Sequence, residues 1–317
     1  MIHITLPDGA VKTFESGTTA LQIARSISEG LARKVIAALV NGEVWDATRP
    51  INEDATLRLL TWSDAEGKST FWHSSAHLMA EAVESVFPGA KFWVGPAIDN
   101  GFYYDMDLGD RQISEEDLRK LEVKMAELAG KNSIYVRKSI PKDEAIRYFR
   151  EKGDEYKLDL LENLKDGEIT FYTQGNFTDL CRGPHIPDTG FIKAVRLTNI
   201  SGAYWKGDEK NKQLTRVYGV SFPSKKELDE YLLMLEEAKK RDHRKLGREM
   251  GIYTMDDDVG QGLILWMPNG TIIIEELEKL AKETELAAGY KRVVTPHIAK
   301  ENLYLTSGHL PYYQDSM

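Results

Sequence analysis

The order of extended and helical segments in the first 62 residues constrains the fold more than any other feature of the chain. Strand-like segments at residues 2–6 and 11–14 flank Pro7-Asp8-Gly9, which is typical of a turn between paired strands. A threonine at position 18 or 19 can cap a short helix after them. Further strand-like segments follow at residues 35–40 and 55–60. This order predicts a small β-grasp domain, and because it holds no cluster of titratable side chains we expect it to dock or bind.

The next part of the chain is expected to form an α+β domain. The 317 residues exceed what one ordinary core holds, so two or three domains are expected. Between residues 63 and 223, helix patterns over 71–86 and 115–129 alternate with extended segments, an order typical of α+β domains. The extended segments lie at residues 91–94, 102–107, 134–136, 169–173, 194–197 and 213–220.

A long charged segment follows this domain. Residues 224–247 read as one helix, with leucines at helical spacing, and we expect it to connect two domains. Residues 239–248 carry six Lys or Arg against one Asp, either as a solvated helix face or as a stripe that contacts phosphates. A helix over 271–288 and a strand over 291–295, which stops at Pro296, are expected after it.

The composition favours a cytosolic protein. A single cysteine rules out an internal disulfide and fits a reducing compartment. The first residues lack the basic start and apolar run of a signal peptide, and no stretch is apolar over the thickness of a bilayer. The net charge of −9 argues weakly against nucleic acid as the dominant partner.

Four residues with matched spacing carry the chemistry. His73 and His77 are four apart on an expected helix, so both imidazoles project from one face, which we expect to lie beside the buried stripe and not within it. Cys181 and His185 are also four apart, and Gly183-Pro184 between them forces a turn. We therefore expect these four side chains to share one site.

Two kinds of site suit these residues. Three imidazoles and a thiol are ligands for tetrahedral zinc. They are equally an acid, base and nucleophile set for hydrolysis, because imidazole titrates near neutral pH. Two unrelated surface pairs are the structural alternative. Nearby, Asp179 could orient an imidazole, and Lys157 or Tyr104 could contact a polar ligand, although each also suits an ordinary structural role.

These motifs resemble the editing domain of bacterial threonyl-tRNA synthetases. The resemblance rests on His73-Ser74-Ser75-Ala76-His77 and on Cys181-Arg182-Gly183-Pro184-His185. It extends to Gly101-Phe102-Tyr103-Tyr104-Asp105 and to Gly202-Ala203-Tyr204-Trp205-Lys206-Gly207-Asp208. The order of the parts agrees over the whole chain.

The resemblance implies an α+β multidomain fold in four parts. They are a TGS domain of β-grasp (ubiquitin-like) fold at 1–62, an α+β editing domain at 63–223, a linker helix at 224–247, and the truncated start of a class II catalytic domain, with an antiparallel sheet, at 248–317. Pro296 matches the proline of motif 1, which builds the dimer interface in this family. Most of the aminoacylation site would lie beyond these residues, so we do not expect the fragment to aminoacylate alone.

The resemblance also implies a function and its residues. The intact protein would be a threonine–tRNA ligase that attaches threonine to tRNA(Thr) with ATP, and this fragment would hydrolyse mischarged Ser-tRNA(Thr). Asp179 and Lys157 would hold the seryl amino group, the terminal ribose or a water, and Tyr104 would help to shape the pocket. The implied editing residues are His73, His77, Tyr104, Lys157, Asp179, Cys181 and His185.

The implied cofactors and partners follow from the same resemblance. We expect no cofactor and no metal for editing, although the donor set could accept zinc; ATP, Mg²⁺ and zinc of the intact synthetase would bind beyond this chain. Expected partners are tRNA(Thr), serine and threonine as aminoacyl groups, and a second copy through motif 1, with no membrane. Two alternatives remain: a zinc-dependent hydrolase, and a non-enzymatic RNA-docking module, since TGS units also occur in regulatory proteins.

Overall fold

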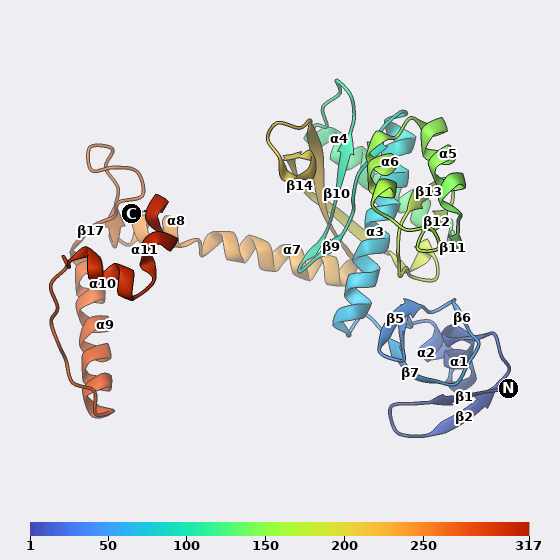
Figure 1. The fold of residues 1–317 in the computed structure, drawn as a ribbon, viewed down its shortest axis with the longest axis horizontal. Helices are drawn as coiled ribbons and strands as arrows, with labels where there is room; N and C mark the ends of the chain where they lie inside the picture. The colour runs from blue at the N-terminus through green and yellow to red at the C-terminus, as the bar shows by residue number, and fades with distance from the viewer. Residues whose placement is uncertain (317) are drawn as a thin grey trace. The chain divides into compact units, whose positions relative to one another are not determined.

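The computed structural model describes residues 1–316, which fall into two compact units that divide between Leu233 and Met234 (Figure 1). The first unit holds the N-terminal domain, as residues 1–62 are called below, and the middle domain, residues 63–223. Among the described helices, none combines the length and the apolar character that crossing a bilayer requires.

The N-terminal domain is a five-stranded mixed sheet with helices packed on it, in the strand order β2-β1-β7-β4-β5. Thr19 caps the first helix, as predicted for a threonine at position 18 or 19, and it forms a reciprocal capping box with Gln22. Asn41 and Gly42 both have positive φ between β4 and β5, as a tight hairpin turn requires. The predicted β-grasp fold is confirmed. Its elements are β1 (Ile2–Thr5), β2 (Val11–Phe14), β3 (Thr18–Thr19), α1 (Ala20–Ile27), α2 (Glu29–Ala32), β4 (Ala37–Val40), β5 (Glu43–Asp46), β6 (Pro50–Ile51) and β7 (Ala55–Leu60).

One helix, α3 (Ala65–Val86), organises the middle domain. It begins six residues before the expected helix. The elements that pack around it are β4, β10 (Gly101–Asp107), α4 (Glu115–Ala129), β13 (Phe177–Leu180) and β15 (Gln213–Phe222). The prediction that both histidines lie beside the buried stripe is wrong for His77, whose exposed fraction is 2%. The sequence pattern assumed one packing face, whereas tertiary contacts cover α3 on most sides, including Ser74 and Ser75.

Two antiparallel sheets complete the middle domain. The larger has the order β14-β15-β10-β8, and the smaller the order β11-β12-β13. The expected strands are present with shifted ends, and Ser114 caps α4 through a reciprocal capping box with Asp117. Strand β13 and helices α5 and α6 were not anticipated. The elements are β8 (Lys91–Phe92), β9 (Ala97–Ile98), β10 (Gly101–Asp107), α4 (Glu115–Ala129), β11 (Val136–Ser139), α5 (Lys142–Lys152), α6 (Glu155–Glu162), β12 (Thr170–Gln174), β13 (Phe177–Leu180), η1 (Thr189–Phe191), β14 (Ala194–Tyr204), η2 (Trp205–Gly207) and β15 (Gln213–Phe222).

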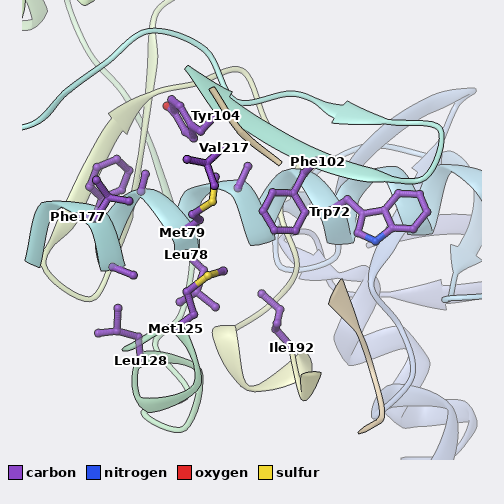
Figure 2. Packing of buried hydrophobic residues seen from close by; sticks show 14 of the residues in the cluster. Trp72, Leu78, Met79, Phe102, Tyr104, Met125, Leu128, Phe177, Ile192 and Val217 are labelled. Carbon is purple, nitrogen blue, oxygen red and sulfur yellow. The ribbon is translucent and has the colours of Figure 1, made fainter. Parts of the chain in front are cut away.

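The main hydrophobic core surrounds α3. Phe102 of β10 and Val217 of β15 pack on one side of the helix, and Met125 of α4 and Ile192 pack on the other (Figure 2). The same cluster includes Ile36, Ala37 and Leu60 of the N-terminal domain. These three residues join the core of the middle domain, whereas the rest of the N-terminal domain's buried hydrophobic residues form clusters of their own.

The segment expected to be one linker helix is two helices. Helix α7 spans Lys225–Lys240 and α8 spans His243–Glu249. Asp242 separates them because its side chain accepts a hydrogen bond from the Arg244 N–H and so caps α8. The prediction of a single helix over 224–247 was wrong at this cap.

The second unit, described by itself, is mainly helical. The predicted helix over 271–288 is α9, which begins three residues earlier with a proline in its first turn. The predicted strand at 291–295 is absent from the described residues, where no other segment pairs with it. The elements are β16 (Tyr253–Thr254), β17 (Leu265–Trp266), α9 (Pro268–Ala287), α10 (Glu301–Thr306), α11 (His309–Tyr312) and η3 (Gln314–Ser316).

Candidate active site

All the residues expected to form a site lie together in the middle domain. Helix α3 supplies His73 and His77, and α6 supplies Lys157. The other residues come from β10, from β13 and from the turn after it, which contains a cis Gly183-Pro184 bond. A pocket of about 270 Å³ is lined by six of the expected residues, His73, His77, Tyr104, Lys157, Asp179 and Cys181. His185 lies behind Cys181, outside this lining.

The Cys181 thiol lies between two imidazoles. Its Sγ is 3.0 Å from Nε2 of His73 and 3.3 Å from Nε2 of His185. The Gly183 N–H also donates to the sulfur, at 3.2 Å. The rings of His73 and His185 stack with their centroids 4.6 Å apart, so the three side chains form one compact group.

Fixed hydrogen-bond partners define which ring nitrogen carries the proton. His73 Nδ1 lies 3.1 Å from the Gly95 carbonyl, which can only accept, so Nδ1 of the neutral ring is the protonated nitrogen. The Ser74 hydroxyl donates to the Thr70 carbonyl at 2.8 Å and therefore accepts from His185 Nδ1 at 3.0 Å. Both Nε2 atoms that face the thiol are then unprotonated. Two proton acceptors thus converge on one S–H group.

Burial keeps this group uncharged. It lowers the pKa of His73, and together with the neighbouring imidazoles it lowers the pKa of His185 well below the ordinary value. Burial and the charge of His73 lower the pKa of His77 to about 3. Burial raises the pKa of the Cys181 thiol to about 12. At neutral pH the site therefore holds neutral imidazoles and a thiol rather than a thiolate.

A buried ion pair forms the opposite wall of the pocket. Lys157 Nζ lies 2.6 Å from Asp179 Oδ1, and both side chains are about as inaccessible as the core, with exposed fractions of 2% and 3%. The Tyr104 hydroxyl donates to Asp179 and accepts from Lys157 at 3.2 Å. Burial raises the pKa of Asp179, but Lys157 and the other neighbours outweigh it, so the net shift is downward. The carboxylate is therefore charged and already neutralised by its partner.

His77 lies between the histidine–thiol group and the Lys157–Asp179 pair. Its Nε2 is 3.9 Å from Asp179 Oδ2, and its ring meets that of His185 edge-on at 4.3 Å. Its Nδ1 is buried and has no hydrogen-bond partner among the described residues. An unpaired buried nitrogen is energetically costly.

The donor atoms of His73, His77, Cys181 and His185 are of the types that bind zinc, and three of these side chains also hydrogen-bond to one another. Their donor atoms lie within 4.8 Å of one another. Zinc bonds of about 2.0 Å to nitrogen and 2.3 Å to sulfur place two tetrahedral ligands about 3.5 Å apart. The sulfur–nitrogen distances of 3.0 and 3.3 Å are shorter and correspond to hydrogen bonds. The four side chains are therefore a possible metal-binding group in which the thiol is hydrogen-bonded to two of the imidazoles.

Two contributors were not foreseen. Ser74 orients His185, and its place between the histidines of the first motif was the available signal. The Gly95 carbonyl orients His73, and a Cβ on Gly95 would come within 2.3 Å of the Tyr104 ring. Gly95 is therefore required by close approach to that ring, which no local sequence pattern reveals.

Two family models match parts of this chain. Residues 2–61 match the TGS domain model, and residues 169–218 match the model of the threonyl and alanyl tRNA synthetase second additional domain. The second match contains Asp179, Cys181 and His185.

Similar curated proteins are threonine–tRNA ligases. That of Cytophaga hutchinsonii is 61% identical over 313 residues, which cover 99% of this chain and 48% of the relative. The ligase of Porphyromonas gingivalis is 56% identical over 318 residues, which cover 100% of this chain and 49% of the relative. The ligase of Bacteroides fragilis is 52% identical over 313 residues, which cover 99% of this chain and 48% of the relative. The chain spans about half the length of the curated relatives it matches.

Proposed function

We propose that this chain, which matches the threonine–tRNA ligases over nearly all of its residues, carries an editing site that hydrolyses mischarged Ser-tRNA(Thr). One observation carries the proposal. The pocket of the middle domain joins a neutral histidine–thiol group to a buried Lys157–Asp179 pair, and its residues lie partly within the matched synthetase domain.

A physical reason makes such a site necessary beside a threonine-selecting synthetase. Serine and threonine differ by one methyl group, and a missing methylene is worth only about 1–3 kcal/mol in a binding pocket. A synthetic site for threonine will therefore also accept some serine. A second site that hydrolyses the seryl ester restores the selectivity.

In the proposed reaction a water attacks the ester carbonyl carbon. The bond from that carbon to the ribose oxygen breaks, and the ribose oxygen takes up a proton, which leaves serine and tRNA with a free hydroxyl. The unprotonated Nε2 of His73, fixed by the Gly95 carbonyl, is placed to accept the proton from water, unless the neighbouring ribose hydroxyl does so. Asp179 and Lys157 hold the seryl amino group, the ribose or the water, and Tyr104 shapes the pocket between them.

Cys181 has a different role in this proposal. A thiol whose pKa lies about 12 is a poor nucleophile at neutral pH. Its S–H instead donates to one of two imidazole nitrogens, His73 Nε2 or His185 Nε2. Cys181 would therefore tune the basicity of His73 and hold His185 in place, without forming a covalent intermediate.

The test is deacylation of mischarged Ser-tRNA(Thr) under single-turnover conditions, with seryl-adenosine ester as a second substrate that does not require tRNA binding. General acid–base groups contribute about 10²–10⁴-fold, so His73→Ala should slow hydrolysis by at least about 10²-fold. Cys181→Ala removes the thiol that positions both imidazoles and should slow hydrolysis by about 10²-fold. The matched control is His3→Ala, since His3 is an exposed histidine of the N-terminal domain whose side chain hydrogen-bonds to Thr13, away from the pocket. Unchanged hydrolysis in both site variants would favour the RNA-docking alternative.

We also propose that editing needs no metal. The hydrogen-bond distances around Cys181 support this. Hydrolysis should survive treatment with a chelator, and purified protein should contain zinc well below one equivalent. Activity that is lost on chelation and restored by zinc would establish the zinc-dependent hydrolase instead.

For the intact protein we propose the ligase reaction of the relatives, ATP-dependent attachment of threonine to tRNA(Thr), in the cytoplasm. ATP, Mg²⁺ and a synthetic-site zinc would bind outside these residues. Residues 248–317 would be the start of a class II catalytic domain, with dimer contacts near Pro296, and α7 and α8 would be the linker. The basic run at 239–248 would contact tRNA, so a Lys240→Glu/Arg244→Glu variant should weaken tRNA binding.

A further inference from the structure

We propose that Asp46, in the N-terminal domain, is a positioning residue for the editing site. It would act by holding the turn that carries Cys181 and His185. The inference rests on the proposed editing function and adds to it a part of the chain that contains no catalytic group.

Asp46 bonds to the editing turn across the domain boundary. It ends strand β5 and is buried, with an exposed fraction of 7%. Its Oδ1 accepts a hydrogen bond from the His185 backbone N–H at 2.6 Å. Its Oδ2 accepts one from the Tyr172 hydroxyl at 2.7 Å. One carboxylate thus ties a strand of the first domain to two elements of the second.

Tyr172 packs against the same turn. A Cβ on Gly183 would lie 2.1 Å from the Tyr172 hydroxyl oxygen, so that oxygen fills the space next to the turn. Gly183 has a φ of +73°, in the left-handed region, so the turn has a tightly defined backbone. The Tyr172 and His185 rings are also in contact, with centroids 4.5 Å apart. Asp46 therefore fixes the turn directly through His185 and indirectly through Tyr172.

The position of this turn sets the geometry of the histidine–thiol group. His185 Nε2 must stay within 3.3 Å of Cys181, and Gly183 N–H must stay within 3.2 Å. Both contacts lie within residues 181–185, the turn to which Asp46 hydrogen-bonds. If the His185 backbone shifted, its imidazole would move away from the thiol, and the second proton acceptor would be lost.

A carboxylate is the group that suits these two donors. It accepts both hydrogen bonds and presents no N–H or O–H of its own. An asparagine of the same shape would turn its NH₂ toward one of the two donors, so one bond would be replaced by a donor–donor contact. Burial raises the pKa of Asp46, and the hydrogen bonds from His185 and Tyr172 act against that rise.

The experiment compares Asp46→Asn and Tyr172→Phe with Asp54→Asn. Asp54 is the matched control because it also accepts a backbone N–H, that of His3 at 2.7 Å, but in the N-terminal domain alone. A misplacement of about 1 Å costs about 10²-fold in rate. We expect the single-turnover rate of seryl-ester hydrolysis to fall about 10²-fold in Asp46→Asn, less in Tyr172→Phe, and not in Asp54→Asn.

Amide hydrogen exchange separates positioning from a general loss of stability. In Asp46→Asn, exchange should accelerate in the segment 181–186 while β4 and β12 keep their protection. Faster exchange throughout both domains would indicate a structural role and overturn the proposal. If Asp46→Asn fails to fold, Tyr172→Phe carries the same two measurements.

The outcomes also separate this inference from the proposed function. If Cys181→Ala abolishes hydrolysis while Asp46→Asn and Tyr172→Phe retain the full rate and normal exchange at 181–186, the positioning role is wrong and the editing function stands. If the wild-type chain does not hydrolyse seryl esters, the editing function fails and this inference fails with it.

Discussion

The buried Lys157–Asp179 pair allows a quantitative test of the site's electrostatics. In Lys157→Met the Asp179 carboxylate would keep two neutral hydrogen-bond donors, the Tyr104 hydroxyl and the Leu180 N–H, which lies at 2.8 Å. It would lose the positive charge of Lys157. Breaking a buried pair by removing one partner costs about 3–5 kcal/mol, because an uncompensated charge remains. Both side chains are at most 3% exposed, so little solvent screening reduces this figure. We therefore expect the variant to lose about 3–5 kcal/mol of unfolding free energy at pH 7.

The pH dependence has a defined sign. In the wild type the pKa of Asp179 is lowered, so its contribution to stability is present above the unfolded-state pKa and lost as the pH falls through the folded-state pKa. In Lys157→Met the loss of the counter-charge leaves burial to raise the pKa of Asp179. Lowering the pH then protonates the Asp179 carboxylate of the variant and removes the cost of its uncompensated buried charge. The stability deficit of the variant should be largest at neutral pH and should shrink toward pH 4.

The assay is urea unfolding followed by circular dichroism at pH 7, 5.5 and 4, with two companion variants. Lys157→Met/Asp179→Leu removes both charges and should recover most of the loss, since apolar replacement of a buried pair is often neutral. Lys225→Met breaks an exposed pair with Asp229 and should change stability little, since exposed pairs are worth about 0–1 kcal/mol. The electrostatic reasoning would be refuted if Lys157→Met lost less than about 1 kcal/mol of unfolding free energy, or if the double variant lost as much as Lys157→Met.

Three further predictions concern single positions. Gly95→Ala should slow seryl-ester hydrolysis by at least about 10-fold, because the added Cβ would displace the Tyr104 ring. Gly30→Ala is the control and should leave the rate unchanged, because a Cβ there meets nothing within 4 Å. Equal rates in the two variants would contradict the close-approach argument. Cys181 should react slowly with iodoacetamide up to about pH 9, because burial raises the thiol pKa to about 12, and fast labelling at pH 8 detected by mass spectrometry would show that the thiolate is accessible. Thr19→Ala removes the cap of α1 and should cost about 1 kcal/mol in urea unfolding, with Thr19→Ser as the variant that keeps the hydroxyl and the stability.

The composition of the candidate site was predictable because its residues are rare and regularly spaced. His73 and His77 follow helical spacing, and the only cysteine repeats that spacing with His185, so a shared site was the simplest interpretation. The β-grasp domain was predictable because Pro7-Asp8-Gly9 and Asn41-Gly42 mark turns by local backbone chemistry.

The rest depends on tertiary contacts that no local pattern carries. Full burial of His77 follows from the strands and the helix that surround α3. The role of Ser74 depends on its hydroxyl being used by Thr70, which makes it an acceptor for His185. The break between α7 and α8 could have been read from Asp242, a preferred cap residue, but the leucine spacing before it dominated the interpretation.

The contacts between the N-terminal domain and the core around α3 limit how far the first two domains can be treated as interchangeable modules. Ile36, Ala37 and Leu60 pack in the same cluster as Phe71 and Ala76 of α3. Gly67 lies so close to the Thr61 carbonyl that a Cβ would come within 2.0 Å of it, so the chain passes from one domain to the next without a free spacer. A chimaera that receives its N-terminal domain from another protein must therefore inherit these contact residues, and Asp46 as well, in order to fold with an intact editing turn.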